Sequence, residues 1–122
     1  MNREAVEQLV VQMADAWMQQ DVAAILLLFT DDGQFISPGG AVQGHAALAA
    51  TATSYFAEIS AVQVTITRVL VDGAQAAVEW TWQETARVTG EQRTMNDAII
   101  FEIQAGKIAY WREYFDPAQQ PS

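Results

Sequence analysis

Apolar and polar residues alternate along the second half of the chain, from residue 61 onward. A period of two residues is typical of β-strands that bury one face. Turn signals at Asp72-Gly73, Thr89-Gly90 and Gln104-Ala105-Gly106 interrupt the alternation. The pattern therefore predicts strands over residues 61–72, 74–88, 92–104 and 107–117.

The first half of the chain has helical spacing instead. Apolar residues recur every three or four positions over residues 4–20, and Asp21 is a suitable N-cap for a short apolar helix to residue 29. A third helix is expected over residues 45–59. Residues 30–33 are expected to form a turn and residues 34–37 a short strand, followed by a loop to Gly44.

Three helices followed by an antiparallel meander predict an α+β fold, a cone-shaped barrel in which the three N-terminal helices pack on a curved antiparallel sheet. We expect a single domain over residues 1–117 and a tail over residues 118–122.

Carboxylates interrupt the apolar face of the predicted sheet. A two-residue turn at Thr89-Gly90 and a three-residue loop ending at Gly106 define the expected pairing, in which Ile103 lies opposite Lys107. This pairing predicts three rows across the inner face: Trp80–Ile99–Trp111, Trp82–Asp97–Glu113 and Glu84–Met95–Phe115.

Burying an unpaired charge costs several kcal/mol. Either the inner face lines a cavity, or these acids are neutral and hydrogen-bonded. Asp97 is accordingly either a site residue or a structural hydrogen-bond partner. If Asp97 and Glu113 are both buried and close, desolvation and repulsion raise the pKa of at least one of them, which gives a proton donor near neutral pH.

Composition narrows the possible chemistry. The 122 residues contain no cysteine and one histidine, which excludes disulfides, thiolate catalysis and a multi-histidine metal site within the chain. The net charge of −9 argues against nucleic acid and anionic lipid as partners. There is no long apolar run and no signal-peptide pattern, so we expect a cytoplasmic protein without a membrane span, a cofactor or a metal.

Three segments resemble the nuclear transport factor 2-like superfamily and its SnoaL-like domains. They are Leu28-Phe29-Thr30-Asp31-Asp32-Gly33, Val42-Gln43-Gly44-His45-Ala46-Ala47-Leu48 and Gly106-Lys107-Ile108-Ala109-Tyr110-Trp111-Arg112-Glu113-Tyr114-Phe115-Asp116. The superfamily includes SnoaL-like polyketide cyclases, ketosteroid isomerase and limonene epoxide hydrolase. The resemblance covers nearly the whole chain and implies the cone fold and a homodimer through the outer face of the sheet. It does not specify one reaction.

The resemblance to limonene epoxide hydrolase places Glu113 where that family has a catalytic aspartate. The two other members of its Asp-Arg-Asp triad fall on Trp82 and Trp80, so the triad is absent and an epoxide hydrolase is the least favoured alternative. Against SnoaL-like cyclases, the inward-facing acid that acts in acid–base catalysis corresponds to Asp97.

Ketosteroid isomerase offers a weaker match. Its general-base aspartate corresponds to Ser37 and its oxyanion-hole tyrosine falls near Met13, so only its oxyanion-hole acid has a counterpart, at or beside Asp97. His45 starts a helix next to a glycine-rich loop, where a histidine is more often solvated or capping than catalytic.

The sequence therefore predicts a pocket protein for a small hydrophobic carbonyl compound, polyketide-like or steroid-like, with cofactor-free isomerase, cyclase, lyase or hydrolase-like proton chemistry. The alternative is a non-catalytic ligand-binding or assembly module. The predicted catalytic residues are Asp97 and Glu113. The predicted ligand-contacting residues are Trp17, Phe35, Ser37, Tyr55, Trp80, Trp82, Glu84, Met95, Ile99, Trp111 and Phe115.

Overall fold

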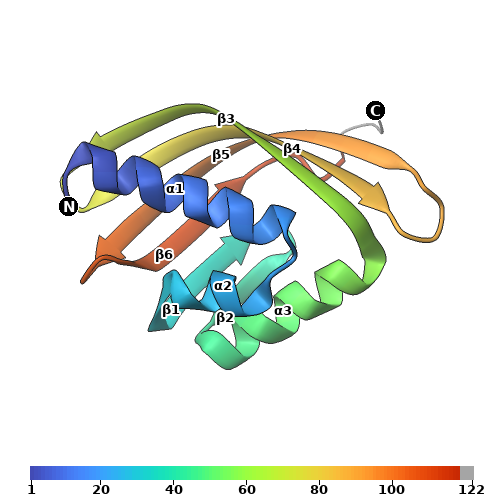
Figure 1. Cartoon of the computed structure of the whole chain (residues 1–122), viewed down its shortest axis with the longest axis horizontal. Helices are drawn as coiled ribbons and strands as arrows, with labels where there is room; N and C mark the ends of the chain where they lie inside the picture. The colour runs from blue at the N-terminus through green and yellow to red at the C-terminus, as the bar shows by residue number, and fades with distance from the viewer. Residues whose placement is uncertain (119–122) are drawn as a thin grey trace.

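A computed structural model describes residues 1–118; residues 119–122, which include most of the predicted tail, lie outside the described part. Three helices pack against one curved six-stranded sheet (Figure 1). The elements in chain order are α1 (Arg3–Met18), α2 (Val22–Leu27), β1 (Phe29–Ser37), β2 (Gly40–Gln43), α3 (His45–Glu58), β3 (Ile59–Asp72), β4 (Gln75–Ala86), β5 (Gln92–Gln104) and β6 (Lys107–Tyr114).

The helices begin where the sequence predicts. Asn2 caps α1 by accepting a hydrogen bond from the Ala5 backbone N–H, and Asp21 caps α2 in the same way through Ala24. The apolar stripe of α1 faces the sheet and is buried there. It consists of Val6, Leu9, Val10, Met13 and Trp17. The three predicted helices and the α+β class are confirmed.

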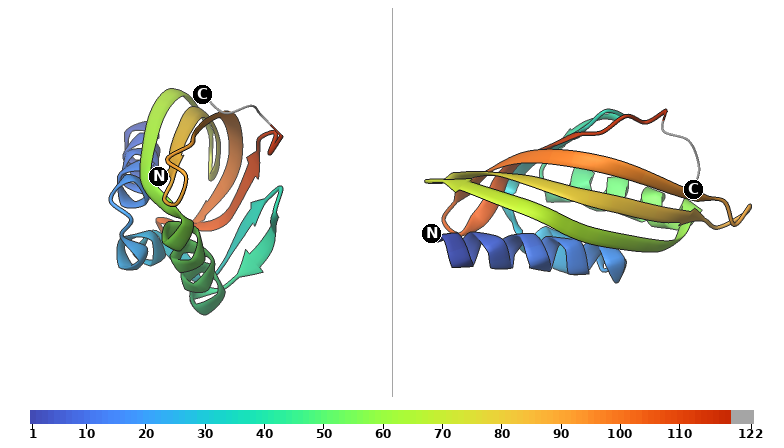
Figure 2. Two further views of the ribbon diagram at one scale, coloured as in Figure 1. Left: turned by 90° about the vertical axis from the view of Figure 1, so that its right-hand side faces the viewer. Right: turned by 90° about the horizontal axis from the view of Figure 1, so that it is seen from above.

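The sheet has the strand order β2-β1-β6-β5-β4-β3, and its two edge strands do not pair with each other. The result is a strongly curved, open sheet with the helices around its concave side (Figure 2). β1 runs parallel to β6, whereas all other neighbours are antiparallel. The sheet is therefore mixed. Its parallel pair joins β1, which precedes α3, to β6, the last strand of the meander, and parallel neighbours need such a long connection between them.

The predicted turn over residues 30–33 is wrong, because these residues form the first half of β1. An irregularity in the pairing of β1 with β6 lies between Phe29 and Gln34. Gly33 is needed there, since a Cβ at this position would lie 3.0 Å from the Phe29 ring and 3.1 Å from the Ile108 carbonyl oxygen. The predicted loop to Gly44 likewise contains a strand, β2.

The hairpin between β5 and β6 has a shorter loop than predicted. Gln104 pairs with Lys107, so only Ala105 and Gly106 form the turn, and both have positive φ. The register then shifts between Glu102 and Ile103. This β-bulge lets two β6 residues only three positions apart, Ile108 and Trp111, both enter the core.

The predicted rows across the sheet are consequently displaced by two residues. Asp97 pairs with Trp80 and not with Trp82, and Glu113 pairs with Ile99 and not with Asp97. A longer connection between β4 and β5, closed by a hydrogen bond from the Gly90 N–H to the Ala86 carbonyl, accounts for the first shift. Because both shifts are even, the residues beyond the bulge stay on their predicted face. Between the turn and the bulge the faces are exchanged: Ile108 is buried opposite Ile103, where Lys107 was predicted.

One end of the concave face is densely packed. Val78, Ile99, Phe101 and Trp111 are at most 1% exposed there, in one core cluster with the buried residues of α1. Val88, predicted on the inner face, lies beyond the end of β4 and is exposed. Within residues 1–118, none of the helices has the length and apolar character needed to cross a bilayer.

Candidate functional site

A cavity of about 160 Å³ opens at the other end of the concave face. All layers of the fold contribute to its wall: α1, α3 and strands β1, β4, β5 and β6. The lining residues are Trp17, Phe35, Ser37, Thr51, Tyr55, Trp82, Glu84, Met95, Asp97, Glu113 and Phe115. The cavity is close in size to an engineered cavity of about 150 Å³ that binds benzene, and smaller than the roughly 300–1,000 Å³ of drug-sized sites.

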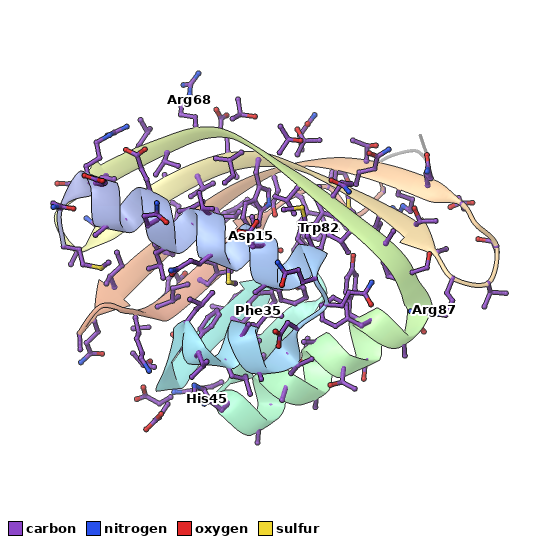
Figure 3. The ribbon with its side chains drawn as sticks, viewed as in Figure 1. Asp15, Phe35, His45, Arg68, Trp82 and Arg87 are labelled. Atoms are coloured by element: carbon purple, nitrogen blue, oxygen red, sulfur yellow. The ribbon has the colours of Figure 1, made fainter. Side chains whose placement is uncertain are left out.

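The cavity lies where α1 ends. The helix stops at Met18, and Gln20 with φ 55° turns the chain back toward α2. Trp17 is thus the last large side chain that α1 places over the sheet. Its ring centroid lies 5.8 Å from those of Phe35 and Trp82 and 6.0 Å from that of Tyr55. In Figure 3, Phe35 and Trp82 lie on the concave side near the end of α1, while Arg68, Arg87 and His45 lie at the periphery.

Asp97 is the one buried charged residue among those described, with 5% of its surface exposed. Its Oδ2 accepts a hydrogen bond from the indole Nε1 of Trp80 at 3.3 Å. Its Oδ1 is buried and has no hydrogen-bond partner within residues 1–118. Buried polar atoms without partners are uncommon and call for an explanation. A ligand group or a bound proton at Oδ1 would supply one.

Glu113 is a diagonal neighbour of Asp97 on the same face of the sheet. Its Oε2 accepts a hydrogen bond from Trp111 Nε1 at 2.9 Å. Burial, and then the nearby charge of Asp97, raise the pKa of Glu113 to about 8, while the Trp111 hydrogen bond opposes the rise.

Burial likewise raises the pKa of Asp97 to about 7, against the lowering effects of the Trp80 indole and of the Tyr114 backbone N–H, which is near the carboxyl but does not meet hydrogen-bond geometry at Oδ1. The two carboxyls titrate as a coupled pair, and the physical cause is the same for both: the charged forms lose water. The pair therefore retains a proton at pH values where exposed carboxyls are ionised. It is suited to proton transfer near neutral pH.

A second polar cluster borders the same cavity. Glu84 Oε1 accepts hydrogen bonds from the Tyr55 hydroxyl at 2.6 Å and from Trp82 Nε1 at 3.1 Å. Burial, followed by the hydrogen bond to Glu84, raises the pKa of Tyr55 far above its ordinary value, so the hydroxyl stays protonated and donates. Each of the three carboxyls in the wall thus receives an indole N–H.

No lysine, arginine or histidine is among the residues that line the cavity. Arg93 pairs with Glu84 across the strands, but its Nη2 donates to the Pro117 carbonyl at 2.6 Å. Arg87 donates to the carbonyls of Phe56 and Ile59 at the end of α3. Within residues 1–118, no three histidine, aspartate or glutamate side chains are grouped so that they could hold a metal ion.

Three predicted ligand contacts lie elsewhere: Trp80, Ile99 and Trp111 are fully packed in the core behind the wall. Each lies two positions along its strand from a residue that does line the cavity: Trp82, Asp97 and Glu113 respectively. The other predicted site residues all border the cavity. Thr51, which the sequence interpretation missed, lies one helical turn before Tyr55, so helical spacing alone could have indicated it.

His45 lies outside the cavity wall. Its Nε2 is 3.1 Å from the Phe29 carbonyl oxygen, which it contacts from the start of α3. This contact connects the helix to the first residue of β1.

Comparison with known proteins agrees with this architecture. A family model described as a SnoaL-like domain matches residues 10–111. The chain belongs to the SnoaL-like domain family. No curated protein matches this SnoaL-like chain significantly by sequence.

Solved structures share the fold at low identity. A hypothetical protein with a ketosteroid isomerase-like fold from Catenulispora acidiphila, in complex with trimethylamine, is 20% identical with a TM-score of 0.85, over 91% of this chain and 87% of the other. An LEH-like epoxide hydrolase from M. tuberculosis is 24% identical with a TM-score of 0.80, over 93% and 83%.

A candidate polyketide cyclase from Xanthomonas campestris is 20% identical with a TM-score of 0.85, over 95% and 93%. Proteins assigned to different reactions thus share the fold of this SnoaL-like domain. The reaction has to be argued from the site.

Proposed function

We propose that this SnoaL-like domain binds a small, mostly apolar carbonyl compound in the cavity and transfers a proton on it without a cofactor. The observation that carries the proposal is the unpartnered Oδ1 of Asp97, buried in the cavity wall beside Glu113. The cavity volume favours a compound of one or two rings over the steroid-like or polyketide-like size expected from the sequence.

The two oxygens of Asp97 have different tasks in this proposal. Oδ2 accepts from Trp80, so a proton on the carboxyl resides on Oδ1. From there it forms a hydrogen bond to the carbonyl oxygen of the ligand. In the ionised state, Oδ1 accepts a proton from the carbon next to the carbonyl, and the resulting enolate is protonated again at another carbon. Glu113 keeps the pKa of the pair close to neutral.

Deuterium exchange tests this proposal directly. Cyclohexanone and cyclopentenone, incubated with the protein in D₂O and followed by proton NMR, should lose the signals of the protons next to the carbonyl faster than in buffer. Asp97→Asn should remove the acceleration while near-UV circular dichroism shows an intact fold. Asp72→Asn, an exposed aspartate at the end of β3, is the matched control.

Failure of exchange with retained ligand binding would instead support the non-catalytic binding module. Tryptophan fluorescence measures that binding, because Trp17 and Trp82 line the cavity. The ligand panel should contain ketones, lactones, epoxides and small amines, the last because trimethylamine is the ligand of the Catenulispora protein. Epoxide hydrolysis has less support, since no arginine lines the cavity.

We further propose a homodimer through the outer face of the sheet, in the cytoplasm. One row across that face runs through Leu70, Ala77, Ile100, Arg112 and Ile36. Leu70 and Ile100 are 55% and 46% exposed. Ile100→Glu should convert a dimer to a monomer in analytical ultracentrifugation. A monomeric wild type would contradict the proposal.

A further inference from the structure

The charges around the cavity do not balance. Three carboxyls line it, from Glu84, Asp97 and Glu113, and no basic residue does. Asp97 and Glu113 reduce their charge by retaining a proton. Glu84 is held differently: its Oε1 accepts hydrogen bonds from two donors, the Tyr55 hydroxyl and the Trp82 indole.

The partner expected for Glu84 is directed elsewhere. Arg93 lies opposite it on β5, and the Nη2 of Arg93 donates to the carbonyl of Pro117. A neutral ligand that displaced water from Glu84 would leave this charge poorly solvated, which is costly. A positively charged ligand would offset that cost.

Aromatic rings surround the same space. Trp17 is in contact with Phe35, Tyr55 and Trp82, at centroid distances of 5.8–6.0 Å. All four rings line the cavity. Aromatic rings attract organic cations through their quadrupole, and indole does so most strongly. Rings together with a carboxylate and without a competing side-chain cation favour an ammonium ligand.

We propose that the cavity binds a small alkylammonium group, held against the rings of Trp17 and Trp82 with Glu84 as its counter-ion. The buried, unpartnered Oδ1 of Asp97 in the same wall is independent evidence that a polar ligand group enters the cavity. This inference rests on the proposed function and deepens it: the molecule that presents its carbonyl to Asp97 also carries an amine, and Glu84 determines that specificity.

Choline and its neutral carbon isostere, 3,3-dimethylbutan-1-ol, provide the test, because they have the same shape and differ in one charge that does not depend on pH. Tryptophan fluorescence titrations at pH 6, where Asp97 and Glu113 retain protons, and at constant ionic strength should show that choline binds to the wild type at least about tenfold more tightly than the isostere does. That ratio corresponds to about 1.4 kcal/mol.

Glu84→Gln should abolish the preference and leave the affinity for the isostere unchanged. The glutamine amide oxygen still accepts from Tyr55 and Trp82, so the fold should survive. Glu79→Gln removes the same charge from the same strand, at an exposed position paired with Arg68, and should retain the preference. Asp97→Asn should also retain it, although it abolishes deuterium exchange.

Equal or tighter binding of the isostere to the wild type would overturn the proposal. So would an unchanged preference in Glu84→Gln, or the absence of choline binding. Exchange of ketone protons without a preference for the cation would remove this inference and leave the proposed function intact. A preference for the cation without exchange of ketone protons would contradict the proposed proton transfer and leave the cation site supported.

Discussion

The two ends of the concave face are built from the same strands but are filled differently. At one end, Phe101 and Trp111 lie 5.1 Å apart between ring centroids and are fully buried beneath α1. At the other end, Trp82 and Glu84 face a cavity. Inward and outward residues alternate at both ends, but the inward residues at the open end include Glu84, Asp97 and Glu113. The opposing layer also differs, because α1 lies over the first end and stops at Met18. A cavity in this fold therefore reflects both where a helix ends and which inward residues the strands carry.

The largest expected effect comes from truncating one tryptophan at each end. Trp111→Ala should lower the free energy of unfolding by about 3–5 kcal/mol, because it empties a fully packed site and removes the indole donor of Glu113. Trp82→Ala should cost about 1–2 kcal/mol, since its ring already borders open space. Urea unfolding followed by far-UV circular dichroism measures both. Equal losses would show that the two ends are packed alike.

The acidic end should also make stability depend on pH. Asp97 and Glu113 have raised pKa values, so between about pH 4 and pH 8 the folded pair keeps protons that the unfolded chain releases. Their contribution to stability is therefore complete below about pH 4 and is lost as the pH rises toward 8.

The double variant Asp97→Asn, Glu113→Gln should remove this loss. Relative to wild type it should gain up to about 4 kcal/mol between pH 4 and pH 8 in urea titrations. Glu79→Gln, on the outer face, corrects for the general effect of lowering the net charge. Parallel pH profiles of the double variant and the wild type would refute raised pKa values.

A smaller effect separates the two carboxyls. In the wild type, the hydrogen bond from Trp80 lowers the pKa of Asp97. Trp80→Phe removes this hydrogen bond but keeps most of the packing. The pKa of Asp97 should therefore rise further, at a stability cost of about 1 kcal/mol. Carbon-13 NMR titration of the carboxyl groups measures this. Trp111→Phe should act in the same way on Glu113, so a shift of the other carboxyl alone would contradict the assigned pairs.

The smallest expected effect lies in the hairpin at the filled end. Ala105 has φ 53°, in a two-residue turn followed by Gly106 with φ 77°. Asparagine tolerates this region better than alanine, and Asn-Gly is the preferred pair for such a turn. Ala105→Asn should raise the free energy of unfolding by about 0.5–1 kcal/mol, and Ala105→Val should lower it. Thermal unfolding at one pH provides the ranking, and the reverse order would contradict the turn type.

Local patterns in the sequence were sufficient for much of the fold. The cap at Asp21, the start of α3 at His45, the apolar stripe of α1 and the strand over residues 92–104 follow from short-range spacing. The inward faces of the strands were also predictable, because an alternation with a period of two survives any even shift in register. For this reason Asp97 and Glu113 were found as inward-facing acids.

Residue pairing was not predictable in the same way. The bulge near Ala109 and the longer loop after Ala86 each shift the pairing of neighbouring strands. The turn residues in the sequence do not indicate either shift. The strand formed by residues 30–33 was read as a turn, because Asp31, Asp32 and Gly33 are typical turn residues. Its place in β1 depends on pairing with β6, which is distant in sequence.

By itself, the sequence determined the helices, the strand faces and the presence of carboxylates on an apolar surface, since these depend on neighbours along the chain. Only the tertiary structure decided which indole meets which carboxyl, that Glu84 joins Tyr55 on α3, and that the space beyond Trp17 stays open. The physical reason is that contacts between layers depend on register and on helix length. A shift of two residues leaves the pattern unchanged but exchanges every partner across the sheet.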